Sequence, residues 1–104
     1  VALDMVLEQC PRTDAIHFAN GDLATGALLH AQRLGLGVPQ DIAIAGFNGL
    51  PLGQQVTPRL TTIQSPRETM GRLAAEQILR RLNDEPITDK QLNVAFRTLI
   101  GEST

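Results

Sequence analysis

Short apolar runs alternate with segments of helical periodicity along this chain, and this alternation most constrains its fold. Residues 14–19 and 41–47 are short and mostly apolar, which is typical of strands covered on both faces. Between them, apolar residues recur every three or four positions from Leu23 to Leu34, which predicts an amphipathic helix. Strands joined through a helix pair in parallel with a right-handed crossover. The sequence therefore predicts an α/β fold with a parallel sheet.

Further elements extend this alternation. Residues 2–9 have helical spacing, residues 60–63 and 92–100 are strand candidates, and one helical turn is expected within residues 50–59. Ser65 is expected to be the N-cap of another helix, with Pro66 at its first position and Glu68 completing a capping box. The apolar stripe of that helix runs from Met70 to Leu82. Because the connections are short, composition marks no clear domain boundary.

Composition narrows the class of protein. The chain has 104 residues, of which 42% are hydrophobic, which is too apolar for a disordered segment. No apolar run approaches the roughly 20 residues that a membrane-spanning helix needs. The single Cys10 excludes an intrachain disulfide and a cysteine-built metal site, and it fits a reduced cytoplasmic compartment. The chain begins without a Met or a basic leader segment, so we expect it to be part of a longer protein.

Charge and motifs argue against two classes of function. The net charge is −2 and the basic residues are scattered, so we expect these residues alone not to bind DNA. Nucleophile-elbow, dinucleotide-loop and P-loop motifs are absent from the sequence, and His17 and His30 have no second metal ligand at helical spacing. We therefore expect no catalytic residues, no metal and no cofactor, and a protein that is not an enzyme.

Two Asn-Gly pairs mark the expected site. Asn20 follows the first strand and Asn48 follows the second, each with a glycine behind it. The carboxyl ends of parallel strands meet at one edge of the sheet, where α/β proteins bind ligands. Asparagine amides both donate and accept hydrogen bonds, which suits a polyol or sugar. A purely structural alternative remains open, because Asn20 could cap the following helix and Asn48 could form an ordinary turn.

Three blocks of sequence resemble the LacI/GalR family of bacterial transcriptional regulators. They are Asp14–Leu28, with the run DAIHFANGDLATGAL, then Leu34–Asn48, with LGLGVPQDIAIAGFN, and Pro58–Pro66, with PRLTTIQSP. Met70-Gly71 follows the third block, and Glu102–Thr104 is similar to the family's C-terminal ending. The blocks occur in family order across nearly the whole chain.

The resemblance implies the C-terminal portion of an effector-binding domain with a periplasmic-binding-protein-like fold, in which two lobes close over a ligand. Residues 1–64 would belong to the C-terminal lobe, residues 65 to about 94 would cross to the N-terminal lobe, and the remainder would return. The resemblance implies that Asn20 and Asn48 contact the effector, and that Arg67 falls at a position that contacts it in some members of the family. At position 48 the family usually has Asp, and at position 101 it usually has Arg where this chain has glycine.

The departure at position 48 points to an acidic effector. An aspartate at position 48 would repel an anionic ligand, whereas Asn48 would not. Gly46–Leu50 and Pro66–Glu68 are similar to the gluconate-repressor branch of the family, and gluconate is a polyol that carries a carboxylate. The first candidate effector is therefore gluconate, within the class of sugars and sugar acids.

The resemblance also implies partners. The whole protein would be a homodimer that binds operator DNA only through an upstream helix-turn-helix domain, and the effector would alter that binding. The dimer interface would include the helix from Asp22 and the apolar residues of the loop, Leu50, Leu52 and Val56, which we expect to be exposed. The alternative function is that of a transport-type periplasmic sugar-binding protein, which shares the fold.

Overall fold

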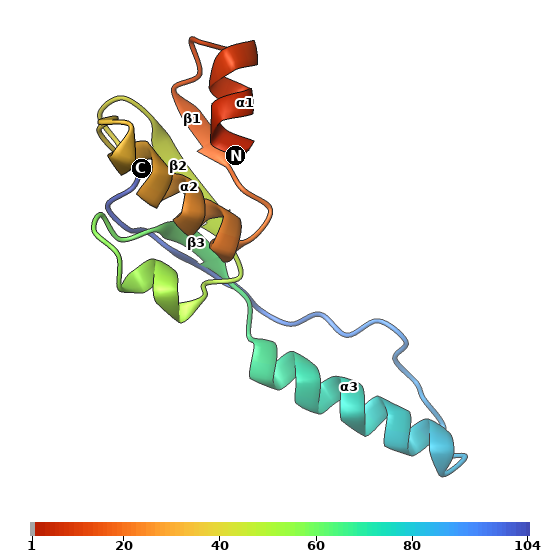
Figure 1. The fold of residues 1–104 in the computed structure, drawn as a ribbon. Coiled ribbons are helices and arrows are strands. Elements are labelled where there is room, and N and C mark those ends of the chain that lie inside the picture. The colour runs from red at the N-terminus through yellow and green to blue at the C-terminus, as the bar shows by residue number, and fades with distance from the viewer. Residues whose placement is uncertain (1) are drawn as a thin grey trace. The chain divides into compact units, whose positions relative to one another are not determined.

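The computed structural model describes residues 2–104, and these fall into two compact units. The first unit comprises the chain up to Gln64 together with Arg97–Thr104, and the second comprises Ser65–Phe96. The elements, in chain order, are α1 (Ala2–Gln9), β1 (Ala15–His17), α2 (Gly21–Arg33), β2 (Ala43–Phe47), the 3₁₀ helix η1 (Pro51–Gln54), β3 (Thr61–Gln64), α3 (Arg67–Leu82) and β4 (Arg97–Leu99). Figure 1 shows them along the chain.

The strands form one sheet in the order β1-β2-β3-β4. β1, β2 and β3 pair in parallel, which confirms the α/β prediction, whereas β4 pairs antiparallel to β3, with Gln64 opposite Arg97. The expectation of uniformly parallel pairing is therefore wrong for the last strand. The chain leaves the first unit after β3 and returns beside the same strand, so β4 runs back along it.

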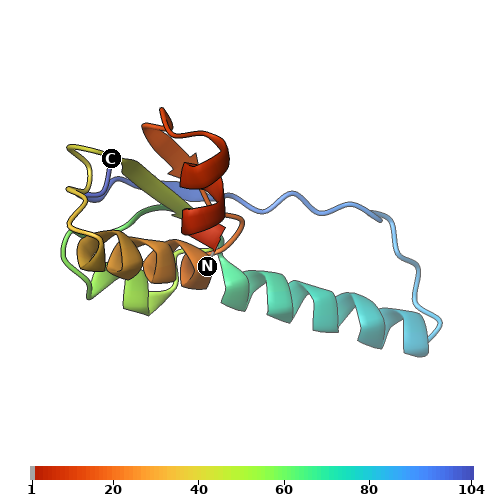
Figure 2. The same cartoon turned by 45° about the horizontal axis from the view of Figure 1, so that its top comes forward.

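One face of the sheet carries the core of the first unit. Helix α2 packs so closely on β2 that a Cβ atom at Gly46 would lie 2.8 Å from the Cβ of Ala24. The buried apolar residues form a single cluster: Leu3, Phe18, Ala24, Ala27, Leu28, Ala31, Val38, Ile42, Ile44 and Leu60. Helix α1 joins α2 through a hydrogen bond of 2.8 Å between His30 Nε2 and Asp4 Oδ1, which holds the pKa of Asp4 below its usual value. Figure 2 shows α1 and α2 together beside the sheet.

The strands are not covered equally on both faces. Along β2, buried Ile44 and Gly46 alternate with half-buried Ala43, Ala45 and Phe47. In β1 both Ala15 and His17 are exposed. The expectation that these strands are covered on both faces is therefore wrong in the described chain, because the core cluster lies on one side of the sheet.

The second unit contains α3 and the segment that follows it. Helix α3 has no buried residue, although its apolar stripe is present as predicted. The stripe and the returning segment line an open groove of about 440 Å³, with Met70, Leu73 and Ile78 from the helix and Ile87, Leu92 and Val94 from the segment.

Two local predictions for residues 65–100 are wrong. The N-cap of α3 is Pro66 and no side chain caps the helix, so Ser65 and Glu68 form no capping box. Because α3 begins at Arg67, Ser65 lies one residue too early to cap it. The backbone of Arg67 instead donates a hydrogen bond of 2.9 Å to the carbonyl oxygen of Ser65. The strand expected over residues 92–100 is confined to Arg97–Leu99.

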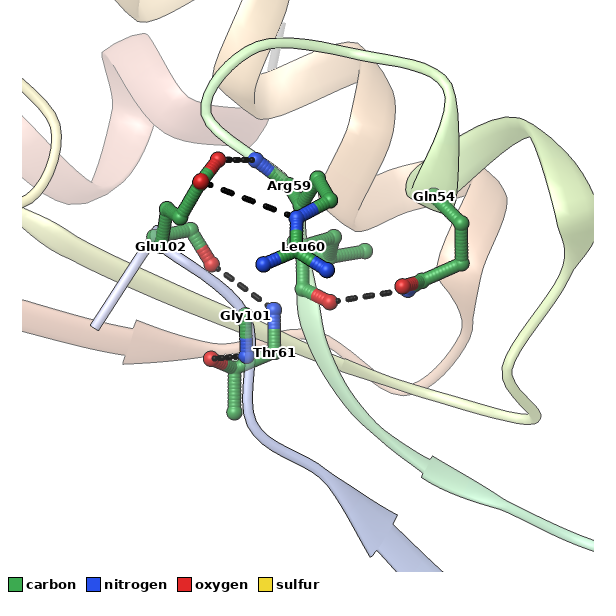
Figure 3. A network of polar contacts seen from close by, with 7 residues as sticks. Gln54, Arg59, Leu60, Thr61, Gly101 and Glu102 are labelled. Carbon is green, nitrogen blue, oxygen red and sulfur yellow. Dashed lines mark hydrogen bonds and ion pairs between the residues drawn. The ribbon is translucent and has the colours of Figure 1, made fainter.

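The C-terminal tail is inserted between β2 and β3 at their amino ends. The backbone of Ile44 donates to the carbonyl oxygen of Ser103 over 2.8 Å, and the fully buried hydroxyl of Ser103 donates back to Ile44 O over 2.6 Å. On the other side, the backbone of Thr61 donates to Ser103 Oγ over 2.9 Å. Glu102 accepts from the backbone of Arg59 at 3.0 Å, as Figure 3 shows. The tail therefore completes the sheet where β2 and β3 are not yet paired.

Gly101 is the point of closest approach in this tail. A Cβ atom there would overlap the carbonyl oxygen of Arg59 and lie 2.7 Å from the carbonyl carbon of Leu60. No side chain fits without a shift of the backbone just before β3. The arginine that the family usually has at position 101 would therefore require a different path of this tail.

We expect Gly101→Ala to lower the free energy of unfolding by about 1–3 kcal/mol, because the added methyl group overpacks a backbone contact. Urea denaturation of the whole protein measures this change. Glu102→Ala is the control, since the carboxylate that it removes from the same tail makes only exposed contacts, a hydrogen bond and an ion pair with Arg59, and should cost less than about 1 kcal/mol. Equal stability of the two variants would contradict the close approach.

Candidate functional site

The two Asn-Gly turns, at Asn20 and Asn48, adjoin at the carboxyl edge of the sheet in the first unit. A Cβ atom at Gly21 would lie 3.4 Å from both the carbonyl oxygen of Phe47 and the Cβ of Leu50. The turn after β1 therefore touches the turn after β2. A Cβ atom at Gly49 would lie 3.0 Å from the Cβ of Gln64, so the turn after β2 also touches the end of β3. Three strand ends are brought together, as the parallel topology predicts.

Asn20 caps helix α2 and keeps part of its amide free. Its Oδ1 accepts a hydrogen bond of 2.9 Å from the backbone of Leu23, and its carbonyl oxygen accepts from Ala24 over 3.2 Å. Within residues 2–104 no acceptor is hydrogen-bonded to its side-chain nitrogen. The capping interpretation is therefore correct, and it still leaves two N–H donors of a half-buried amide for a ligand.

Asn48 occupies a backbone conformation that few residues adopt. Its φ is 79°, in the left-handed region, and the following Gly49 has a φ of 54°. The turn is fixed by a buried hydrogen bond of 3.1 Å from the backbone of Gly49 to Thr62 Oγ1. In the described chain the side-chain amide of Asn48 has no hydrogen-bond partner, although the residue is half-buried. Asparagine tolerates this conformation better than most residues, so a structural and a binding role are compatible here.

The sequence did not single out Gln64 and Arg97, which lie at the same edge. Gln64 ends β3, directly beside Gly49, and Arg97 begins β4 opposite it. Arg97 Nε donates to Gln64 Oε1 over 2.7 Å. The expected strand over residues 92–100 would have placed Arg97 in mid-strand. Only the antiparallel return of β4, beginning at residue 97, brings this arginine to the carboxyl edge.

The other predicted binding residue belongs to the second unit. Arg67 is the first residue of α3, and its side chain is exposed. The site described here rests on the first unit alone, so a role of Arg67 in ligand binding stays a prediction.

The loop residues expected at a dimer interface differ in exposure. Leu52, in η1, is 56% exposed, as expected. Leu50 is half-buried beside Gly21, and Val56 packs against the core cluster, so the expected exposure is wrong for these two residues. Leu23 and Leu29 of α2 are exposed as well.

Across residues 2–104 no three His, Cys, Asp or Glu side chains are grouped so that they could hold a metal ion. The same residues include no helix that is long and apolar enough to cross a membrane. The arrangement is a set of neutral amides and one guanidinium group, which recognise polar ligands by hydrogen bonding.

Known proteins resemble this chain over most of its length. Residues 2–104 match the family described as periplasmic binding protein-like domain. The chain is 46% identical over 93 residues to the HTH-type transcriptional regulator GntR of Escherichia coli (strain K12), which covers 89% of the chain and 28% of the relative. The chain therefore belongs to the periplasmic binding protein-like domain family, and it is similar to part of LacI-family transcriptional regulators.

Solved structures show the same likeness. The transcription regulator GntR from Chromobacterium violaceum superposes with a TM-score of 0.88 at 39% identity, over 98% of this chain and 38% of that one. A LacI family regulator from Arthrobacter sp. FB24, in complex with lactose, superposes with a TM-score of 0.82 at 30% identity, over 99% and 40%. This chain thus spans less than a third of its curated relative and about two-fifths of each solved structure.

The capping role of Asn20 gives a stability prediction. Asn20→Ala should lower the free energy of unfolding by about 0.5–2 kcal/mol, because the backbone N–H of Leu23 loses its acceptor. Asn20→Ser keeps an oxygen that can accept this bond and should stay within about 0.5 kcal/mol of the unmodified protein. Thermal unfolding of the whole protein measures both. If serine is as damaging as alanine, Asn20 does not stabilise the protein by capping.

Proposed function

We propose that this chain is the effector-sensing portion of a LacI-type transcriptional regulator. It binds a small sugar or sugar acid, with gluconate as the first candidate, in a cleft between two lobes. Binding alters how a helix-turn-helix domain elsewhere in the protein holds operator DNA. The relatives reported above are transcriptional regulators, which does not favour the transport alternative or an enzyme.

The observation that carries the proposal is the pair of adjoining asparagine corners. Asn20 and Asn48 lie on neighbouring strand ends, and both keep side-chain amide groups without acceptors in the described chain. Half-buried amide donors lose hydrogen bonds to water, and a ligand with several hydroxyl groups restores them. The lactose complex of a structural relative supports a polyhydroxylated ligand.

The division into units supports the assignment of lobes. The first unit would be the C-terminal lobe, and residues 65–96 would belong to the N-terminal lobe, as the resemblance implies. With the asparagines on one lobe and Arg67 on the other, the ligand would contact both lobes only when they close. A ligand with this preference shifts the population towards the closed arrangement, and that shift would be transmitted to the DNA-binding domain.

Gluconate binding to the whole protein tests the site. We expect Asn48→Gly to weaken binding by about 1–3 kcal/mol, because polar groups of the bound ligand lose their partner. Glycine is preferable to alanine here, since an alanine at a φ of 79° would add backbone strain to the lost hydrogen bonds. Isothermal titration calorimetry measures the affinity.

Asn93→Gly is the matched control, because Asn93 is an exposed asparagine in the second unit that makes no hydrogen bond in the described chain. Its affinity for gluconate should be unchanged. Asn20→Asp keeps the oxygen that caps α2 but removes the two N–H donors of the amide. Unaltered affinity in both Asn48→Gly and Asn20→Asp would overturn the site. Tight binding of a neutral hexose without any binding of gluconate would overturn the ligand class.

The proposal includes a homodimer, since a two-fold operator needs a symmetric reader. Leu52, Leu23 and Leu29 are exposed apolar residues on η1 and α2, the two segments assigned to the interface. We expect a Leu29→Glu, Leu52→Glu double variant to shift the whole protein from dimer to monomer in light scattering at micromolar concentration. Met5→Glu, which changes an exposed residue on α1, is the control and should remain dimeric. A whole protein that is monomeric without substitutions would contradict the proposal.

A further inference from the structure

One nitrogen of the Arg97 side chain forms a hydrogen bond within the described chain, and the two terminal nitrogens do not. Its Nε donates to Gln64 Oε1 over 2.7 Å, and the two residues are paired across β3 and β4. No other residue within 2–104 accepts a hydrogen bond from its side chain, and none of the described carboxylates forms an ion pair with it. The terminal nitrogens Nη1 and Nη2 therefore retain four N–H donors and a positive charge that nothing in the described chain neutralises.

The position of Arg97 is set by the register of the sheet. The last pair of β2 with β3 is Phe47 with Ile63, so Asn48 and Gln64 each come one residue later. Gln64 in turn is opposite Arg97. Asn48, Gln64 and Arg97 thus stand in successive strands at the same level of the carboxyl edge. An arginine in this row shares an edge with the proposed hydroxyl-binding amides.

This combination suits a ligand that has hydroxyl groups at one end and a carboxylate at the other. Guanidinium groups bind carboxylates through two parallel hydrogen bonds, and such charge-assisted pairs are about twice as strong as neutral ones. Fixing Nε on Gln64 leaves less side-chain freedom to lose when a ligand binds. A neutral sugar has no group that needs this charge.

We propose that Arg97, positioned by Gln64, binds the carboxylate of the effector and sets the preference for a sugar acid over the corresponding neutral polyol. This inference rests on the proposed function, because it assigns a residue to the same ligand site. It locates recognition of the anion on the first unit, beside Asn48, whereas Arg67, for which the resemblance implies an effector contact, lies in the second unit.

A competing role is purely structural. Gln64 and Arg97 are the residues at which the chain leaves and re-enters the first unit, so their hydrogen bond also ties the two crossings together. Loss of a purely structural hydrogen bond would weaken the binding of every ligand alike. Recognition of a carboxylate would affect acids only, and the two roles therefore predict different results.

The experiment compares gluconate with glucitol, which has a CH₂OH group where gluconate has its carboxylate. Calorimetry on the whole protein gives both affinities for Arg97→Gln and Arg97→Lys. Arg97→Gln should bind gluconate about 10- to 150-fold more weakly, which is the range for a lost hydrogen bond to a charged group, and bind glucitol within about threefold of the unmodified protein. Arg97→Lys should recover part of the loss, since it keeps the charge without the paired geometry.

Arg59→Gln is the matched control, because Arg59 is an exposed arginine just before the amino end of β3, in the same unit. Its affinities should not change. Equal losses for gluconate and glucitol in Arg97→Gln would assign a structural tie and overturn the inference, as would unchanged binding of both. If Asn48→Gly loses gluconate while Arg97→Gln does not, the proposed function stands and this inference fails. If the unmodified protein binds neither ligand, this inference and the choice of gluconate as the effector are both overturned.

Discussion

The hydroxyl group of Ser103 holds together two strands that the rest of the first unit depends on. It donates to β2 at Ile44 and accepts from β3 at Thr61, in a fully buried position. Because β2 and β3 begin their own pairing only at Ala45 and Thr61, the tail supplies the sheet's hydrogen bonds before that level. A buried backbone N–H without a partner costs about 1–3 kcal/mol, so this position strongly favours a side chain that both donates and accepts. The last residues of the chain are thus part of the sheet's interior.

The tail secures the amino ends of the strands, whereas the proposed site lies at their carboxyl ends. There the strands finish in turns, and the polar groups are directed by caps and turns instead of by sheet pairing. Asn20 uses one oxygen to begin a helix, and Asn48 accepts a left-handed conformation so that Gly49 can pack against Gln64. Each residue serves the fold with one group and leaves another exposed to a ligand. Structural and binding roles that look like alternatives in the sequence are therefore compatible in the same residues.

Sequence periodicity was sufficient to predict the elements of residues 2–64, because they are short and separated by glycine and proline. The observed helix Gly21–Arg33 and strand Ala43–Phe47 lie within two residues of the predicted segments. The direction of β4 could not be predicted, since alternation of strands and helices carries no signal for an excursion that returns antiparallel to the strand it left. Arg97 was overlooked for the same reason. Its importance depends on which end of a three-residue strand it occupies, and only the pairing of Gln64 with Arg97 settles that.

The second unit depends on contacts that its own residues do not provide. Helix α3 has an apolar stripe but no buried residue, and a 16-residue helix in isolation is only marginally stable in water. Most of a helix's stability comes from burying its apolar face, so Met70, Leu73 and Ile78 need a further surface beyond the segment that lines their groove. Both ends of this unit are anchored where Gln64 pairs with Arg97, which is also the edge that carries the proposed ligand site. A ligand bound at that pair would contact the two segments through which the chain leaves and re-enters the first unit.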